Sequence, residues 1–211
     1  MLNSFNPALL QSECLGVVLA GGLSSRMGQD KAKLVRDKNS TMSMLSFSKR
    51  LLKESGLNNI VVSGDNYDVP DTVSEGGPVG GILSILTKFP QAKSLLILPV
   101  DLPFMTAKAL TNLRLKGELS QKAVYFEGHN IPLYLPNNSY VELFLSQAIN
   151  TFNNTAERNL VSDGKNKKSG PSIKALLKHV PNIALQSSDE NILFNTNTPE
   201  QWQQATQKFN S

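Results

Sequence analysis

The sequence predicts a single α/β domain, a three-layer, Rossmann-like fold in which helices cover both faces of a mostly parallel central sheet. Short apolar runs alternate along the chain with longer segments at helical spacing, which is typical of β-α-β units. A chain of 211 residues is long enough for one core, because folding at this length buries roughly 70% of the unfolded chain's surface. The predicted domain therefore spans residues 1–211, with residues 1–14 as a loose leader.

In the first half of the chain, predicted strands and helices alternate regularly. Residues 15–20 form an apolar run closed by glycines, which predicts a strand buried on both faces. Apolar residues at mixed helical spacing predict a helix over 41–55, with Gly56 as its C-terminal stop. Further strands are expected at 59–63 and 94–100, with a helix between them at about 79–88. Because parallel sheets collect ligands at the carboxyl ends of their strands, residues that follow these runs are the candidates for a site.

The second half is less regular. The loop 153–170 is polar and rich in lysine, so it is expected to form a mobile surface loop. The remaining predictions are strands at 123–126 and 133–135, and helices at 140–149 and 172–179.

Composition argues against several classes of protein. No uncharged apolar run approaches the roughly 18 residues that a membrane-spanning helix needs. The first basic residue is Arg26, so we expect no secretory signal. The single cysteine, Cys14, cannot form an internal disulfide, and only two histidines accompany it, which favours a cytoplasmic protein without a zinc site. The net charge of +4 favours anionic ligands but is too small to indicate nucleic-acid binding.

The most informative stretch is the glycine-rich loop after the first predicted strand. Gly21 and Gly22 let the backbone approach a phosphate or a base closely. Ser24 and the serine after it can donate hydrogen bonds, while Arg26 and Lys31 can neutralise a polyphosphate. The spacing matches neither the P-loop nor the dinucleotide-binding pattern. Two glycines alone are equally typical of an ordinary turn, so the residues predict a nucleotide cradle only as a group.

A candidate metal ligand follows the apolar run 94–100. Asp101 stands just beyond that run, where a parallel sheet places its ligands. Magnesium prefers oxygen donors and usually takes one or two protein carboxylates beside substrate phosphates. Without further context, an aspartate shortly before Pro103 is more typical of a turn or a helix cap.

A family resemblance appears in residues 19–31, which read L-A-G-G-L-S-S-R-M-G-Q-D-K. They closely resemble the signature L-A-G-G-x-S-x-R-M-G-x-D-K of the molybdenum cofactor guanylyltransferases, which belong to the nucleotidyltransferase superfamily. The resemblance implies that the backbone of Leu19, Ala20 and Gly21 holds the guanine or ribose. It also implies that Arg26 and Lys31 contact the triphosphate. Related cytidylyltransferases more often carry alanine in place of Gly21, which favours guanine.

Further segments extend the resemblance over most of the chain. Residues 99–104 match the family's metal-binding P-x-D-x-P-F, which makes Asp101 the predicted magnesium ligand and nucleotide contact. Residues 77–83, which include Pro78, resemble the family's G-P-L-A-G-h-L, where h is apolar, and Asp71 matches an aspartate that contacts nucleotide.

The C-terminal part carries the residues for the second substrate. Residues 194–200 resemble the family's N-x-N-T-P-E, which implies that Asn195 or Asn197 binds the metal or the second substrate. Lys167 and Lys168 lie where family members carry basic residues, so they are candidates for the anionic pterin cofactor. A solvated cationic loop is the competing interpretation of these lysines.

Two positions depart from the family pattern. Ser63 stands where the family commonly has an asparagine that contacts nucleotide, so we expect a shorter donor there. Ile131 precedes Pro132 where the family tends to have histidine, which leaves open how the pterin is held. His129, His179 and Cys14 have no neighbouring partner motif and are expected to be structural or surface residues.

The resemblance implies a magnesium-dependent transfer of GMP from GTP to the terminal phosphate of molybdopterin, with pyrophosphate leaving. Its ligands are Mg²⁺, GTP and molybdopterin, with transient contact to cofactor-delivering proteins left open and no nucleic acid or membrane expected. The catalytic residues are then Arg26, Lys31 and Asp101. Two alternatives remain: transfer of another nucleotide, such as CMP, to a related phosphate, or a catalytically idle relative that only binds nucleotide.

Overall fold

The computed structural model describes residues 14–20, 30–36, 41–72, 76–148 and 170–209. The expected leader begins outside this set, since the first described residue, Cys14, already belongs to the first strand. The expected surface loop at 153–170 also lies outside it, except for Gly170. No helix among the described residues is long and apolar enough to cross a membrane.

A six-stranded sheet forms the centre of the molecule, with the order β2-β1-β3-β5-β4-β6. The pairs β1/β2, β1/β3 and β4/β6 are parallel, whereas β5 runs antiparallel to both β3 and β4. This mixed, mostly parallel sheet confirms the predicted α/β fold. Its strands are β1 (Cys14–Leu19), β2 (Ile60–Ser63), β3 (Ser94–Pro99), β4 (Ala123–Phe126), β5 (Leu133–Pro136) and β6 (Asn182–Leu185).

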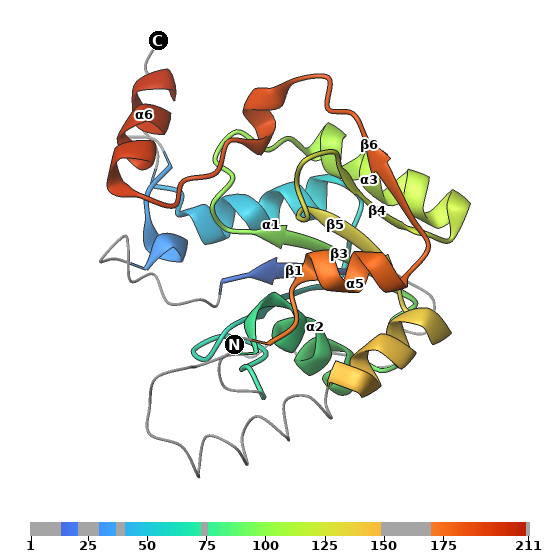
Figure 1. The fold of residues 1–211 in the computed structure, drawn as a ribbon. Coiled ribbons are helices and arrows are strands. Elements are labelled where there is room, and N and C mark those ends of the chain that lie inside the picture. Colours follow the sequence, from blue (N-terminus) through green and yellow to red (C-terminus); the bar gives the residue numbers. More distant parts are fainter. Residues whose placement is uncertain (1–13, 21–29, 37–40, 73–75, 149–169, 210–211) are drawn as a thin grey trace, which may run out of the picture.

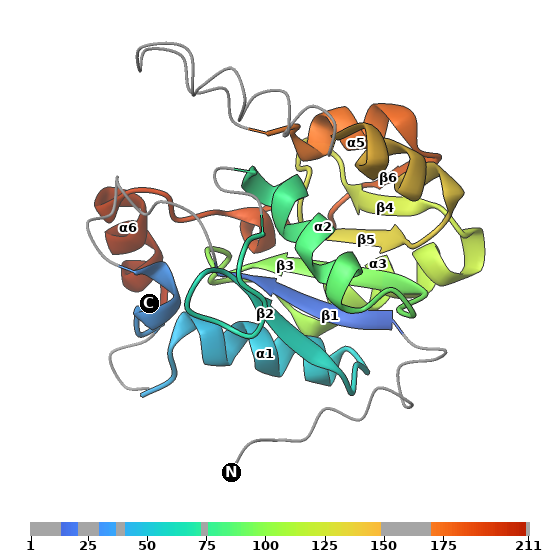
Figure 2. The same cartoon turned by 90° about the horizontal axis from the view of Figure 1, so that it is seen from below.

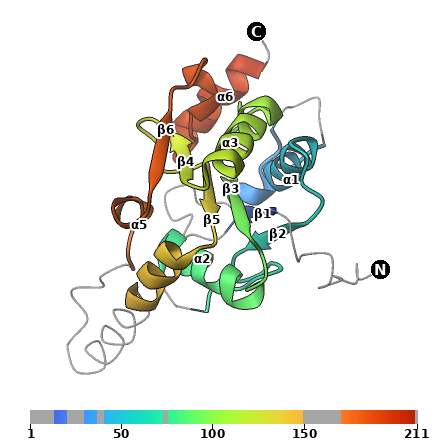
Figure 3. The same cartoon turned by 90° about the vertical axis from the view of Figure 1, so that its right-hand side faces the viewer.

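Helices cover both faces of the sheet (Figures 1, 2 and 3). One face packs against α1 (Met44–Glu54) and α3 (Ala107–Ser120). The other face packs against α2 (Gly77–Lys88), the helix over residues 139–148 and α5 (Ile173–His179). The remaining helices are α6 (Pro199–Phe209) and two 3₁₀ segments, η2 (Lys31–Lys33) and η3 (Glu190–Leu193).

Strand alternation produces the two cores. In β1, Val17 faces the α2 side and Val18 faces the α1 side, and both are fully buried. In β3, Ile97 and Leu98 divide in the same way. This pattern explains why these strands appear in the sequence as continuous apolar runs, since a strand buried on both faces has no polar side.

Three elements, α3, β6 and α6, were not predicted from the sequence. Apolar residues in α3 are not confined to one face: Leu110 and Leu113 are fully buried, whereas Leu119 is 86% exposed. A helix without a clear apolar stripe gives a weak periodic signal. β6 is a short edge strand with no buried residue, and its apolar run covers only residues 183–185, which is too short to indicate a strand by itself.

Gly117 allows α3 to pack tightly on the sheet. A Cβ atom at this position would overlap the ring of Tyr134, which lies 2% exposed in β5. We predict that Gly117→Ala lowers the free energy of unfolding by about 1 to 3 kcal/mol, even though alanine favours helix, because the ring and backbone must shift. Denaturant unfolding measures this loss. Leu119→Ala, on the exposed face of the same helix, is the control and should change stability by less than about 0.5 kcal/mol; equal stability of the Gly117 variant and wild type would contradict the prediction.

Candidate functional site

Three strands end side by side at one edge of the sheet. Leu19 in β1 pairs with Ser63 in β2 and with Pro99 in β3. Beyond the strands, the Ala20 N–H donates to the Ser63 carbonyl at 3.0 Å, and the Val100 N–H donates to the Leu19 carbonyl at 3.3 Å. The residues that follow these strands therefore begin from fixed and adjacent positions.

A cluster of three side chains lies at this edge. The Lys31 ammonium is 3.2 Å from the Asp101 carboxylate and donates a hydrogen bond of 2.7 Å to the Asn197 side-chain oxygen. The Lys31 and Asp101 side chains are 17% and 19% exposed, so the ion pair is largely shielded but reachable. The structure thus brings together three predicted site residues from distant parts of the chain.

The segment before α6 is fixed to the metal candidate by backbone contacts. Thr196 is fully buried, and both its N–H and its hydroxyl donate to the Asp101 carbonyl, at 2.9 and 3.2 Å. On either side of it, the Asn197 amide donates to the Asn195 side-chain oxygen at 2.9 Å. Sequence reasoning missed Thr196, and only its place between the two predicted asparagines could have indicated it.

Lys31 is positioned from its own side as well. Asp30 caps η2 by accepting from the Ala32 N–H at 3.0 Å, and it also accepts from the Tyr67 hydroxyl at 3.2 Å. Tyr67 lies in the loop after β2, so this bond connects the beginning of η2 to the end of the neighbouring strand. The aspartate of the Asp30-Lys31 pair is therefore a positioning residue for the lysine.

Aromatic contacts hold α6 against the rest of the site. The Arg36 guanidinium lies 4.3 Å from the Phe47 ring centroid in α1 and 4.6 Å from that of Phe209 in α6. Phe104, shortly after Asp101, packs against the rings of Phe194 and Phe209. These contacts keep the segment with Asn195 and Asn197 beside the carboxyl ends of the strands.

The donors at this edge are suited to a hard cation. Asp101, Asn195 and Asn197 supply carboxylate and amide oxygens, and an ammonium group already contacts two of these residues. Among the described residues, no three His, Cys, Asp or Glu side chains gather into a group that could hold a metal alone. This set fits a magnesium-type ion that takes one protein carboxylate and completes its shell with substrate phosphates and water.

A second cluster lies on the β1/β2 side of the same edge. The Ser63 hydroxyl, 2% exposed, donates to the Asp71 carboxylate at 3.4 Å. A Cβ atom on Gly81 of α2 would lie 3.0 Å from the Ser63 hydroxyl, so the glycine permits the close approach of that helix. Burial raises the pKa of Asp71, the nearby Asp65 carboxylate raises it further, and the bond from Ser63 opposes both.

The remaining predicted residues are distributed around these clusters. Leu19 and Ala20 lie at the end of β1, and Pro78 stands exposed in the first turn of α2. The other predicted contacts fall outside the described residues: Gly21, Gly22, Ser24, Arg26, Lys167 and Lys168.

A family model for the MobA-like NTP transferase domain matches residues 16–145. The chain belongs to the MobA-like NTP transferase family. Membership confirms the predicted family and nucleotidyltransferase class, and the matched region contains Lys31, Ser63, Asp71 and Asp101.

Individual relatives agree with this assignment. A molybdenum cofactor guanylyltransferase from Xanthomonas euvesicatoria pv. vesicatoria (strain 85-10) is 31% identical over 198 residues, which cover 92% of this chain and 94% of the relative. Among solved structures, the molybdopterin-guanine dinucleotide biosynthesis protein A of Archaeoglobus fulgidus has a TM-score of 0.65 at 18% identity, covering 93% and 98% of the two chains. A Mycobacterium tuberculosis protein in complex with manganese has a TM-score of 0.52 at 13% identity, covering 93% and 98%. The two structures support the fold.

Asp71 generates a prediction about stability and pH. Because the folded state raises its pKa above the ordinary 3.8, the folded chain holds this proton more firmly, and folding loses stability as pH rises through the raised pKa. Asp71→Asn removes that loss. We predict that the variant without nucleotide is more stable than wild type at pH 7, and that the difference shrinks below about pH 3.8. Urea unfolding across this pH range measures the difference in stability, and Glu142→Gln is the exposed control. An Asp71→Asn variant that is less stable than wild type at pH 7 would contradict a raised pKa for Asp71.

Proposed function

We propose that this protein transfers GMP from GTP to the terminal phosphate of molybdopterin and releases pyrophosphate. The convergence of Lys31, Asp101 and Asn197 at the carboxyl edge of the sheet carries this proposal. The identity of 31% to a molybdenum cofactor guanylyltransferase over nearly its whole length supports the choice of substrates.

The reaction needs charge neutralisation more than proton transfer. A phosphate monoester is largely ionised near neutral pH, so its oxygen can attack the α-phosphorus of GTP without a general base. The new phosphorus–oxygen bond forms as the bond to the bridging oxygen of the β-phosphate breaks, and that oxygen leaves with the electron pair. The Lys31 ammonium neutralises charge on the phosphates, and Asn195 and Asn197 orient the incoming phosphate. Arg26, outside the described residues, is proposed to assist Lys31.

We assign Asp101 as the residue that would hold Mg²⁺ together with the phosphates. Bound there, the ion would supply Lewis-acid stabilisation of the phosphoryl oxygens. The ammonium of Lys31 now contacts this carboxylate, so the lysine must exchange that partner for a phosphate oxygen when the substrate binds. The Lys31 ammonium therefore neutralises the Asp101 carboxylate until Mg²⁺ and the substrates bind.

We assign base and ribose binding to the β1/β2 side. Leu19 and Ala20 offer backbone groups there, while Ser63 and Asp71 offer a hydroxyl and a carboxylate. Gly21, Gly22, Ser24 and Pro78 remain proposed contacts of the same nucleotide. Lys167 and Lys168 remain proposed contacts of the pterin cofactor.

A nucleotide panel tests the proposed function. With molybdopterin and Mg²⁺, we expect pyrophosphate release from GTP and little from CTP, UTP or ATP. Asp101→Ala should reduce turnover more than about 100-fold, yet keep the fold, because Thr196 binds the backbone carbonyl of Asp101 and not its carboxylate.

The control variant for this panel is Glu54→Ala, at the end of α1 on the opposite edge of the sheet. We expect its turnover to equal that of wild type. A preference for CTP would favour a cytidylyltransferase. Absence of pyrophosphate release with every nucleotide would favour an idle binding relative, and wild-type turnover by a folded Asp101 variant would contradict the metal assignment.

A further inference from the structure

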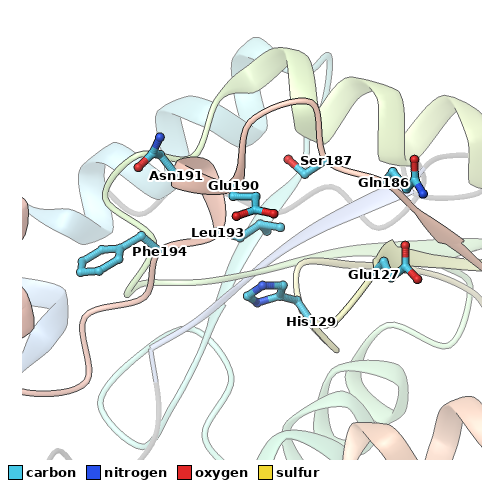
Figure 4. Close-up of a pocket in the computed structure, with 9 residues that line it drawn as sticks. Glu127, His129, Gln186, Ser187, Glu190, Asn191, Leu193 and Phe194 are labelled. Carbon is cyan, nitrogen blue, oxygen red and sulfur yellow. The ribbon is translucent and has the colours of Figure 1, made fainter.

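An open cleft of about 850 Å³ lies between the β4–β5 connection and the segment that follows β6. Glu127 and His129 line it from the connection, while Glu190, Leu193 and Phe194 line it from η3 and the residue after it. In Figure 4, the Glu190 carboxylate and the Leu193 side chain lie between the η3 ribbon and the His129 imidazole. None of these residues was predicted from the sequence to bind a ligand.

The cleft continues the edge at which the phosphates are proposed to bind. β5 lies next to β3 and runs antiparallel to it, so the start of β5 is at the same edge as the end of β3. β4 ends and β6 ends at that edge too, because β4 is antiparallel to β5 and parallel to β6. Phe194 lines the cleft and directly precedes Asn195, so one segment connects the cleft to the Lys31–Asp101 cluster.

The cleft is lined by polar side chains that can still bind a ligand, next to an apolar surface. Within the described part of the chain, no hydrogen bond or ion pair engages the side chains of Glu127, His129 or Glu190. Leu193 is 5% exposed and Phe194 is half-buried, which gives a flat ligand an apolar contact. Carboxylates accept hydrogen bonds from N–H groups and repel phosphates, so this cleft favours a heterocycle with an N–H edge over a triphosphate.

We propose that this cleft binds the pterin ring system of the second substrate and that Glu190 accepts hydrogen bonds from its amino-pyrimidinone edge. The inference rests on the proposed function, which supplies a substrate with a pterin at one end and a phosphate at the other. The 2-amino group and the adjacent ring N–H present two neighbouring donors, and a carboxylate matches them with two acceptor oxygens. The anionic phosphate then points along residues 194–197 toward Lys31.

The size of the cleft agrees with this occupant. Small-molecule sites usually enclose about 300 to 1,000 Å³, and the cleft falls within that range. The order along the edge becomes nucleotide at β1 and β2, phosphates at β3, and pterin at β4, β5 and β6. That order places the attacking phosphate between its own ring system and the α-phosphate of GTP.

Fluorescence titration of the full chain with 6-hydroxymethylpterin tests the inference, and 6-hydroxymethyllumazine, which has oxygen in place of the 2-amino group, is the matched ligand. We expect wild type to bind the pterin more tightly than the lumazine. Glu190→Gln should weaken pterin binding about tenfold, the typical effect of losing one charge-assisted hydrogen bond. It should not weaken lumazine binding, because the glutamine amide can accept from the ring N–H that lumazine keeps and donate to the oxygen that replaces the 2-amino group. Glu142→Gln, an exposed glutamate outside the cleft, should bind both as wild type does.

Equal pterin binding by wild type and Glu190→Gln, equal losses for both ligands, or no pterin binding by wild type would overturn the inference. GTP affinity, measured in the same samples, should be unchanged in both variants and shows that they are folded. The two proposals fail separately. If pyrophosphate is released from GTP and molybdopterin but Glu190→Gln has no effect on pterin binding, the proposed function is supported and the pterin site is contradicted. If pterin binding depends on Glu190 but no nucleotidyl transfer occurs, the pterin site is supported and the proposed function is contradicted.

Discussion

The bridge formed by Lys31 between Asp101 and Asn197 is the interaction on which the site depends. It joins η2, the loop after β3 and the segment before α6, and its two charged members are less than one-fifth exposed. A charge shielded to this degree is costly without a partner, so each of these groups stabilises the position of the other. Thr196 fixes the same segment through the Asp101 backbone, which leaves the carboxylate itself free to change partners.

The parts of the structure that could be predicted from the sequence are those that local patterns determine. The apolar runs of β1 and β3 fixed their burial, and the rule that ligands collect at carboxyl ends placed Asp101 correctly at the edge. Lys31 and Asn197 were associated with Asp101 only through family resemblance, because no local pattern links positions so far apart. The strand β5 was predicted, but its antiparallel direction was not, since pairing direction is a tertiary property. The helix α3 was not predicted, because the exposed Leu119 obscures its apolar face.

The cleft was missed for a related reason. Glu127 and Glu190 follow no chemical motif, and they line one cleft because β4 and β6, the strands that precede them, pair in parallel at the side of the sheet away from β2. On the opposite side, Asp71 retains a raised pKa because burial and Asp65 disfavour its charge. Along this edge, the Lys31–Asp101 ion pair therefore has Asp71 on one side and Glu127 and Glu190 on the other.

The position of a divalent ion bound together with GTP is the decisive test of whether Asp101 holds the metal. Manganese can be located by its anomalous scattering in crystals of the protein grown with GTP. We expect manganese to be coordinated by the Asp101 carboxylate and by phosphate oxygens, with the Lys31 ammonium moved from Asp101 to the triphosphate. Manganese and triphosphate bound away from Asp101, with the Lys31–Asp101 ion pair unchanged, would contradict this expectation.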